Sequence, residues 1–100
     1  MVQKIIWSDD ALITFGEAVK YLLDDFSQIQ LYKFEAKIER KLLILKSNPR
    51  LGRKVGKRPN TYKTVVNKRV ALYYQYRPIE KVIILLSFWN TLQNPKKLKF

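Results

Sequence analysis

Apolar residues in the first half of the chain recur at the three- and four-residue spacing of a helix. The first such stripe predicts one buried helix face and consists of Leu12, Phe15, Val19, Leu22 and Phe26. Ser8 precedes it and can accept a backbone N–H bond as an N-cap, and Asp9 and Asp10 place negative charge at the positive end of the helix dipole. Gly16 lies within the stripe and indicates close packing against a neighbouring element.

A second stripe follows almost at once and consists of Leu31, Phe34, Ile38, Leu42 and Leu45. Ser27 and Gln30 form an S-x-x-Q capping box at its start. Asn48 and Pro49 end this helix, because the residue before a proline is pushed out of the helical conformation. Two long helices with so short a link predict an antiparallel helical hairpin.

Shorter apolar runs predict strands. Residues 3–7 form one run before the first helix, and residues 62–66, 70–76 and 82–88 form three more near the end. The short connection between 62–66 and 70–76 suits a hairpin. The run at 82–88 is apolar without alternation, which predicts a central strand buried on both faces. Residues 51–60 combine glycine and proline with basic residues and predict an exposed basic loop.

The elements therefore follow the order strand, helix, helix and three strands, which predicts an α+β fold in a single domain over residues 1–100. The helical hairpin should pack on one face of an antiparallel three-stranded meander, and the N-terminal strand must find an edge or a gap in that sheet. Strand alternation places Tyr74 and Tyr76 on one face and Tyr73 on the other, with one set expected to pack beneath the helices.

Composition narrows the available chemistry. The chain has neither histidine nor cysteine, which excludes a Ser-His-Asp triad, a thiolate nucleophile and metal sites built on these ligands. Asp24 and Asp25 are neighbours on a helix and do not point together. No metal site and no cofactor is therefore expected, and acid–base chemistry would need lysine, arginine, tyrosine or carboxylate groups.

The net charge of +12 is unevenly distributed, with −3 over residues 1–39 and +15 over residues 40–100. Such one-sided charge attracts polyanions. The candidate nucleic-acid or partner-binding residues are therefore the cations of the second part of the chain: Arg50, Arg53, Lys54, Lys57, Arg58, Lys63, Lys68, Arg69 and Arg77. A solvated basic surface without a specific partner is the alternative interpretation.

Membrane association is not expected. The longest apolar run, residues 82–86, is too short to span a bilayer. Neither predicted helix has the basic polar face with an exposed apolar side that a membrane-surface helix requires. The N-terminal residues meet Asp9 and Asp10 before any long apolar stretch, so no targeting segment is predicted and the cytoplasm is the expected location.

Several segments together resemble the RelE/ParE family, the small toxins of type II toxin–antitoxin systems. The resemblance covers nearly the whole chain. It rests on residues 5–7, the two helices, an L-x-x-N-P-x-x-G-R element at residues 45–53, the LYYQYR run at 72–77 and the segment 85–98. The resemblance implies the same α+β fold and a cognate antitoxin as partner, whose extended segment and helix wrap the toxin.

Two activities divide that family. RelE-like members cleave mRNA in the ribosomal A site, and ParE-like members inhibit DNA gyrase. Cleavage of mRNA needs a proton acceptor, a proton donor and cations around the phosphate. Lysine, tyrosine and arginine can supply these groups without histidine. If the chain were such a nuclease, the resemblance would make Lys54, Lys57, Arg58 and Arg69 the candidate catalytic residues.

The end of the chain departs from the nuclease pattern. Asn90 stands where aspartate is expected, Leu92 stands where arginine is expected, and no tyrosine follows Tyr76. Loss of one donor to the transition state typically costs about 10²–10³ in rate. We therefore expect a ParE-like or divergent toxin that acts on gyrase or another target. A ribosome-dependent mRNA endonuclease is the alternative, and a small basic nucleic-acid-binding module without toxicity is the alternative from another class.

Overall fold

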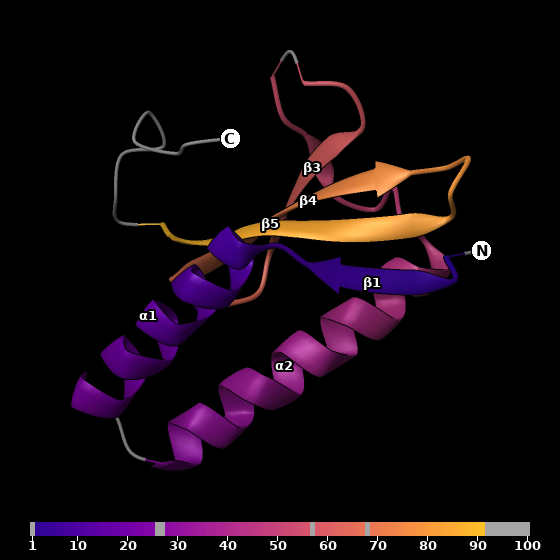
Figure 1. Cartoon of the computed structure of the whole chain (residues 1–100). Helices are drawn as coiled ribbons and strands as arrows, with labels where there is room; N and C mark the ends of the chain where they lie inside the picture. The colour runs from indigo at the N-terminus through magenta and orange to yellow at the C-terminus, as the bar shows by residue number, and fades with distance from the viewer. Residues whose placement is uncertain (1, 26–27, 57, 68, 92–100) are drawn as a thin grey trace.

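The computed structural model describes residues 2–25, 28–56, 58–67 and 69–91, with the backbone alone for residues 21–25. The chain begins with one strand and two helices: β1 (Lys4–Trp7), α1 (Asp9–Asp25) and α2 (Gln28–Ser47). Four strands complete it: β2 (Arg53–Lys54), β3 (Thr61–Val65), β4 (Val70–Arg77) and β5 (Val82–Asn90). Both helices lie on the same side of the sheet (Figure 1), which confirms the predicted α+β class.

The five strands form one mixed sheet in the order β1-β5-β4-β3-β2. The predicted antiparallel meander is present as β3, β4 and β5. The N-terminal strand takes an edge place and runs parallel to β5, with Ile5 opposite Ile83. The prediction of a loop over residues 51–60 was wrong at Arg53 and Lys54, because β2 pairs there with β3 and forms the other edge of the sheet.

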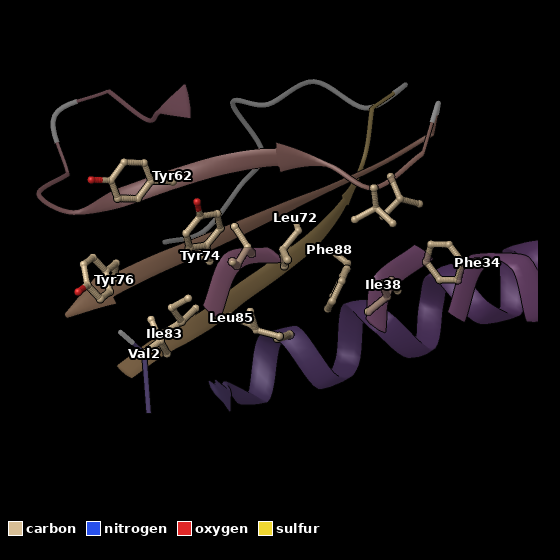
Figure 2. Close-up of a cluster of buried hydrophobic side chains, with 14 residues drawn as sticks. Val2, Phe34, Ile38, Tyr62, Leu72, Tyr74, Tyr76, Ile83, Leu85 and Phe88 are labelled. Atoms are coloured by element: carbon tan, nitrogen blue, oxygen red, sulfur yellow. The ribbon is translucent and has the colours of Figure 1, made fainter. Parts of the chain in front are cut away.

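The hydrophobic core lies between the two helices and the inner face of the sheet, and Figure 2 shows part of it. The second helical stripe is confirmed, since Phe34, Ile38 and Leu45 are buried. The strands contribute Tyr62, Leu72, Tyr74, Tyr76, Ile83, Leu85 and Phe88. The last strand lies inside the sheet, between β1 and β4. Its inner-face residues such as Ile83 are buried, whereas on the outer face Ser87 is buried and Val82, Ile84 and Leu86 are half-buried. Among the described residues, neither helix combines the length and apolar character needed to cross a membrane.

The first helical stripe was wrong at Leu12, which is 56% exposed, whereas the neighbouring Ala11 is completely buried. The helix α1 presents Ala11, Phe15 and Ala18 to the core. The small alanine side chains let its backbone lie close to β5. The side chain of Leu22, together with Phe26 and the capping residue Ser27, lies outside the described residues.

Two hydroxyl groups join α1 to β5 where that strand extends past the end of β1. Ser8 is the predicted N-cap, since its Oγ accepts the Ala11 N–H at 3.0 Å, and it also donates to the Leu86 carbonyl at 3.2 Å. Thr14 Oγ1 accepts the Phe88 N–H at 2.9 Å and donates to the Asp10 carbonyl at 2.6 Å. These side chains bond to strand-edge groups that no neighbouring strand reaches.

Replacement of Thr14 by Val should lower the free energy of unfolding by about 1–3 kcal/mol, because the Phe88 N–H would lose its acceptor in a partly buried place. Urea denaturation followed by circular dichroism measures this change. Thr14→Ser keeps the hydroxyl and should cost less than half as much. A loss in Thr14→Ser without a loss in Thr14→Val would show that the methyl group of Thr14, and not its hydrogen bond, holds α1 against β5.

Candidate functional site

The outer face of the sheet, which points away from the helices, carries a row of residues that crosses four strands. Strand alternation puts Tyr74 in the core and therefore Tyr73 on the outer face. The strand register then places four residues side by side, and we call them the outer row: Arg53, Lys63, Tyr73 and Ser87. The row begins at the exposed edge strand β2 and ends on β5, which lies inside the sheet between β4 and β1.

Exposure falls from one end of the outer row to the other. Arg53 is exposed, Lys63 is half-buried, and Tyr73 is only 3% exposed. The Lys63 Nζ lies 5.8 Å from the centroid of the Tyr73 ring, within the range of a cation–π contact. Burial raises the pKa of the Tyr73 hydroxyl, so this group stays protonated at neutral pH and cannot act there as a base. The outer row can therefore bind a ligand through its cations, but its tyrosine does not supply a base at neutral pH.

A second pair of cations lies further along the same face. Arg77 is opposite Val82 on β5, and Val82 is opposite Lys4 on β1. The Arg77 Nε donates to the Gln75 Oε1 at 3.2 Å. Sequence reasoning missed Lys4, because its place on this face depends on the parallel pairing of the two ends of the chain. The strand-like run at residues 3–7 was the only signal, and it did not say which strand would be the neighbour.

Carboxylate partners are scarce on this face. Glu80 is the only acidic residue after Glu39, and its Oε2 lies 3.6 Å from the Arg77 Nη1. Within the described part of the chain, Lys4, Arg53 and Lys63 form no ion pair. Cations without carboxylate partners are available to bind phosphate or carboxylate groups of another molecule.

The buried Tyr74 holds the segment that carries Arg53. Its hydroxyl donates to the Pro49 carbonyl at 2.9 Å and accepts the Gly52 N–H at 3.0 Å. Burial raises the pKa of Tyr74, which keeps the donated proton in place. A Cβ atom on Gly52 would lie 2.8 Å from the Lys63 carbonyl oxygen and 2.8 Å from the Tyr74 hydroxyl. The close approach of the backbone therefore requires glycine at this position.

No family model matches the sequence, and no curated protein matches it. Solved structures do match the fold. A copper-bound variant of a Helicobacter pylori toxin superposes with a TM-score of 0.65 at 18% identity, over 92% of this chain and 97% of that one. The E. coli toxin RelE, in complex with an antitoxin RelBc peptide, has a TM-score of 0.65 at 16% identity, over 96% and 90%. A YoeB/ParE toxin from Agrobacterium tumefaciens has a TM-score of 0.60 at 10% identity, over 88% and 98%.

The chain has the fold of the RelE and ParE toxins. The sequence predicts one binding surface for the cations of the second half of the chain. In the RelE/ParE fold these cations lie on different faces of the molecule. The fold brings Arg53, Lys63 and Arg77 to the outer face of the sheet. Lys54 follows Arg53 on β2, so alternation places it on the opposite face of that strand.

The remaining predicted cations lie elsewhere in the RelE/ParE fold. The Arg50 guanidinium carbon lies 5.0 Å from the ring centroid of Tyr76, on the inner side of the sheet. Arg58 precedes β3 and Arg69 follows it, so the two are separated by the length of that strand, about 16 Å. The structure does not bring these two candidate catalytic residues together. Lys57, Lys68 and Leu92 lie outside the described residues.

Proposed function

We propose that the chain is the toxin of a type II toxin–antitoxin system, neutralised by a cognate antitoxin. We further propose that it acts by binding its target, as a ParE-like or divergent inhibitor, rather than by cleaving RNA. The likeness in fold to RelE and YoeB/ParE toxins over most of both chains supports the first part. The outer row is the observation that carries the second, because its lysine and arginine have no carboxylate partner among the described residues, while its tyrosine is buried.

The outer row suits binding better than phosphate cleavage. Cleavage by a 2′-hydroxyl attack needs a group that takes a proton and a group that gives one, both able to change protonation near neutral pH. The tyrosine of the row has its pKa raised by burial, away from that range. Arg53 and Lys63 can hold a phosphate or an acidic surface without proton transfer. Gyrase and its bound DNA are a target of this kind, and the same cations would also serve a divergent target.

Induction of the protein without its partner tests this proposal. Growth, plasmid supercoiling and the 5′ ends of cellular mRNA should be measured in the same cultures, with Arg53→Glu/Lys63→Glu as the matched variant. We expect growth arrest with reduced supercoiling and intact mRNA, and a return to normal growth in the double variant. Co-expression of the protein encoded by the adjacent reading frame should also restore growth.

Two outcomes would contradict the proposal in different ways. New mRNA ends at regular positions within translated codons would identify a RelE-type endonuclease and would refute the binding mechanism. Normal growth at confirmed protein levels, together with retained affinity for nucleic acid, would identify a binding module without toxicity. Circular dichroism of the double variant shows whether a lost effect reflects a lost fold.

A further inference from the structure

The outer face of the sheet carries two pairs of cations, of which the outer row contains only one. We call Arg53 and Lys63 the first pair, and Lys4 and Arg77 the second pair. The members of the second pair lie in one row of the sheet, on either side of Val82, and both are exposed. Arg77 lies four residues along β4 from the outer row, so the two pairs are well separated on the same face.

Strand geometry gives the distance between the two pairs. Each residue advances a strand by about 3.4 Å, and neighbouring strands are about 4.8 Å apart. The step along β4 therefore separates the pairs by about 14 Å along the strands. The strand order β1-β5-β4-β3-β2 separates their centres by about 12 Å across the strands. The centres of the two pairs are thus about 18 Å apart on the outer face.

The row of residues midway between the pairs is uncharged. The strand register places its four members side by side: Thr61, Gln75, Ile84 and Ile6. Gln75 and Ile84 are half-buried, and Ile6 is 38% exposed. None of these side chains is aromatic, so the row offers no ring on which an unpaired base could stack. A ligand that uses both pairs must therefore present two separate lines of negative charge.

Double-helical DNA presents two such lines. The major groove of B-DNA is about 12 Å wide, and the phosphate centres on its two sides are about 18 Å apart once the size of the phosphate groups is included. A single strand has only one line of phosphates and would have to cross the uncharged row to reach the second pair. The wide minor groove of an RNA duplex displays 2′-hydroxyls, which need polar partners. Ile6 and Ile84 suit the thymine methyl groups of the DNA major groove better.

Glu80 lies beside the second pair without blocking it. Its Oε2 is 3.6 Å from the Arg77 Nη1, and the two side chains are 59% and 49% exposed. An ion pair exposed to this extent contributes little to stability, so the guanidinium remains available to a phosphate. The backbone beneath the pair is fixed, because the Gln3 N–H donates to the Lys81 carbonyl at 2.7 Å. This bond ties the strand of Lys4 to the turn that follows Arg77.

An anionic membrane fits the outer face less well. Stable membrane association needs apolar side chains that enter the lipid beside the cations. Exposed apolar side chains lie instead on α2, where Ile29, Tyr32 and Leu43 are 65%, 70% and 66% exposed. The expectation that neither helix has an exposed apolar side was therefore wrong for α2, but this helix lies on the other side of the sheet (Figure 1). Ile79 is exposed on the turn near the second pair, and one side chain of this size anchors a protein only weakly.

We propose that the outer face binds duplex DNA across its major groove, with the first pair on the phosphates of one strand and the second pair on those of the other. The inference rests on the proposed function in that it names the ligand of the same face. The proposed function requires that this face bind a target, and it does not require contact with two DNA strands. Binding to two strands is measured with purified protein and does not depend on toxicity.

Anisotropy titrations of the full chain with a labelled DNA duplex of about 16 base pairs test this inference. A second, half-neutral duplex has uncharged methylphosphonate linkages throughout one strand. Lys4→Gln/Arg77→Gln should weaken binding to the intact duplex about 10-fold, because two phosphate contacts are lost. The same variant should lose almost nothing on the half-neutral duplex, because the first pair can still bind the charged strand. The intact duplex should bind at least about 10-fold more tightly than its single strands.

Two further variants complete the comparison. Arg53→Gln/Lys63→Gln removes the first pair and should show the same difference between the two duplexes. Lys33→Gln/Lys37→Gln removes the same charge from α2 and should bind each duplex as the original protein does. Circular dichroism checks the fold of every variant.

Several results would overturn the inference. Equal losses of Lys4→Gln/Arg77→Gln on the two duplexes would show that one strand contacts all four cations. Equal losses in the α2 control would show that net charge alone attracts DNA. Tighter binding of a single strand, of an RNA duplex of the same sequence, of polyglutamate or of phosphatidylserine vesicles would identify another ligand. A toxic chain with any of these results would refute only this inference, and a harmless chain that binds both DNA strands would refute only the proposed function.

Discussion

Charge reversal of Arg53 and Lys63 together should weaken binding of the protein to duplex DNA and to ribosomal RNA by about 10- to 100-fold at about 50 mM salt. The two side chains lie next to each other on the outer face and have no carboxylate partner among the described residues. Each contact with a phosphate releases counterions, so the slope of log affinity against log salt should fall in magnitude by about 2 when both contacts are lost. Anisotropy titrations over a salt series measure both quantities.

The matched control is Lys33→Glu/Lys37→Glu, which changes the net charge by the same amount on the opposite side of the molecule. It should retain most of the affinity and the salt slope of the original protein. Equal losses in the two double variants would mean that net charge alone attracts nucleic acid and that the outer row has no special part in binding.

The second large effect concerns Gly52. Gly52→Ala should lower the free energy of unfolding by about 1–3 kcal/mol, because the new Cβ would lie 2.8 Å from a backbone oxygen of β3 that cannot move without disturbing the sheet. The hydrogen bond from Gly52 to the Tyr74 hydroxyl should break at the same time. Thermal and urea denaturation measure the stability, and amide hydrogen exchange at residues 52–54 reports the release of β2.

Gly16→Ala is the control for this substitution. A Cβ at Gly16 meets no atom within 4 Å, so the close packing that its place in the helical stripe predicted was wrong. Alanine there should raise the stability by about 0.5–1 kcal/mol through helix propensity alone. A destabilised Gly16→Ala together with an unaffected Gly52→Ala would contradict the geometry described for both segments.

The features that the sequence predicts well are those that depend on neighbouring residues. Ser8 caps α1 because its side chain needs only the N–H group three residues later. Pro49 ends α2 because its ring constrains the residue before it. The core stripe of α2 follows from helical periodicity, since Phe34, Ile38 and Leu45 face one continuous surface. Each of these effects acts within one or two turns of the chain.

The features that were missed depend on distant partners. Lys4 reaches the outer face only through the parallel pairing of β1 with β5, and no local pattern specifies that neighbour. Arg53 and Lys54 form a strand because β3 offers them an edge. Ala11 replaces Leu12 in the core because α1 must lie close enough to β5 for Thr14 to bond to it. The sequence pattern of α1 alone does not predict this close approach to β5.

The pairing of Lys4 with Val82 joins residues 78 positions apart in the chain. Closing so long a loop lowers the conformational entropy of the chain before any stabilising contact has formed. The N-terminal strand should therefore be among the last elements to dock during folding. The antiparallel meander has short connections and can form earlier. During synthesis, Trp7 has no strand to join until Leu85 has been added, so β1 lacks its strand partner for most of translation.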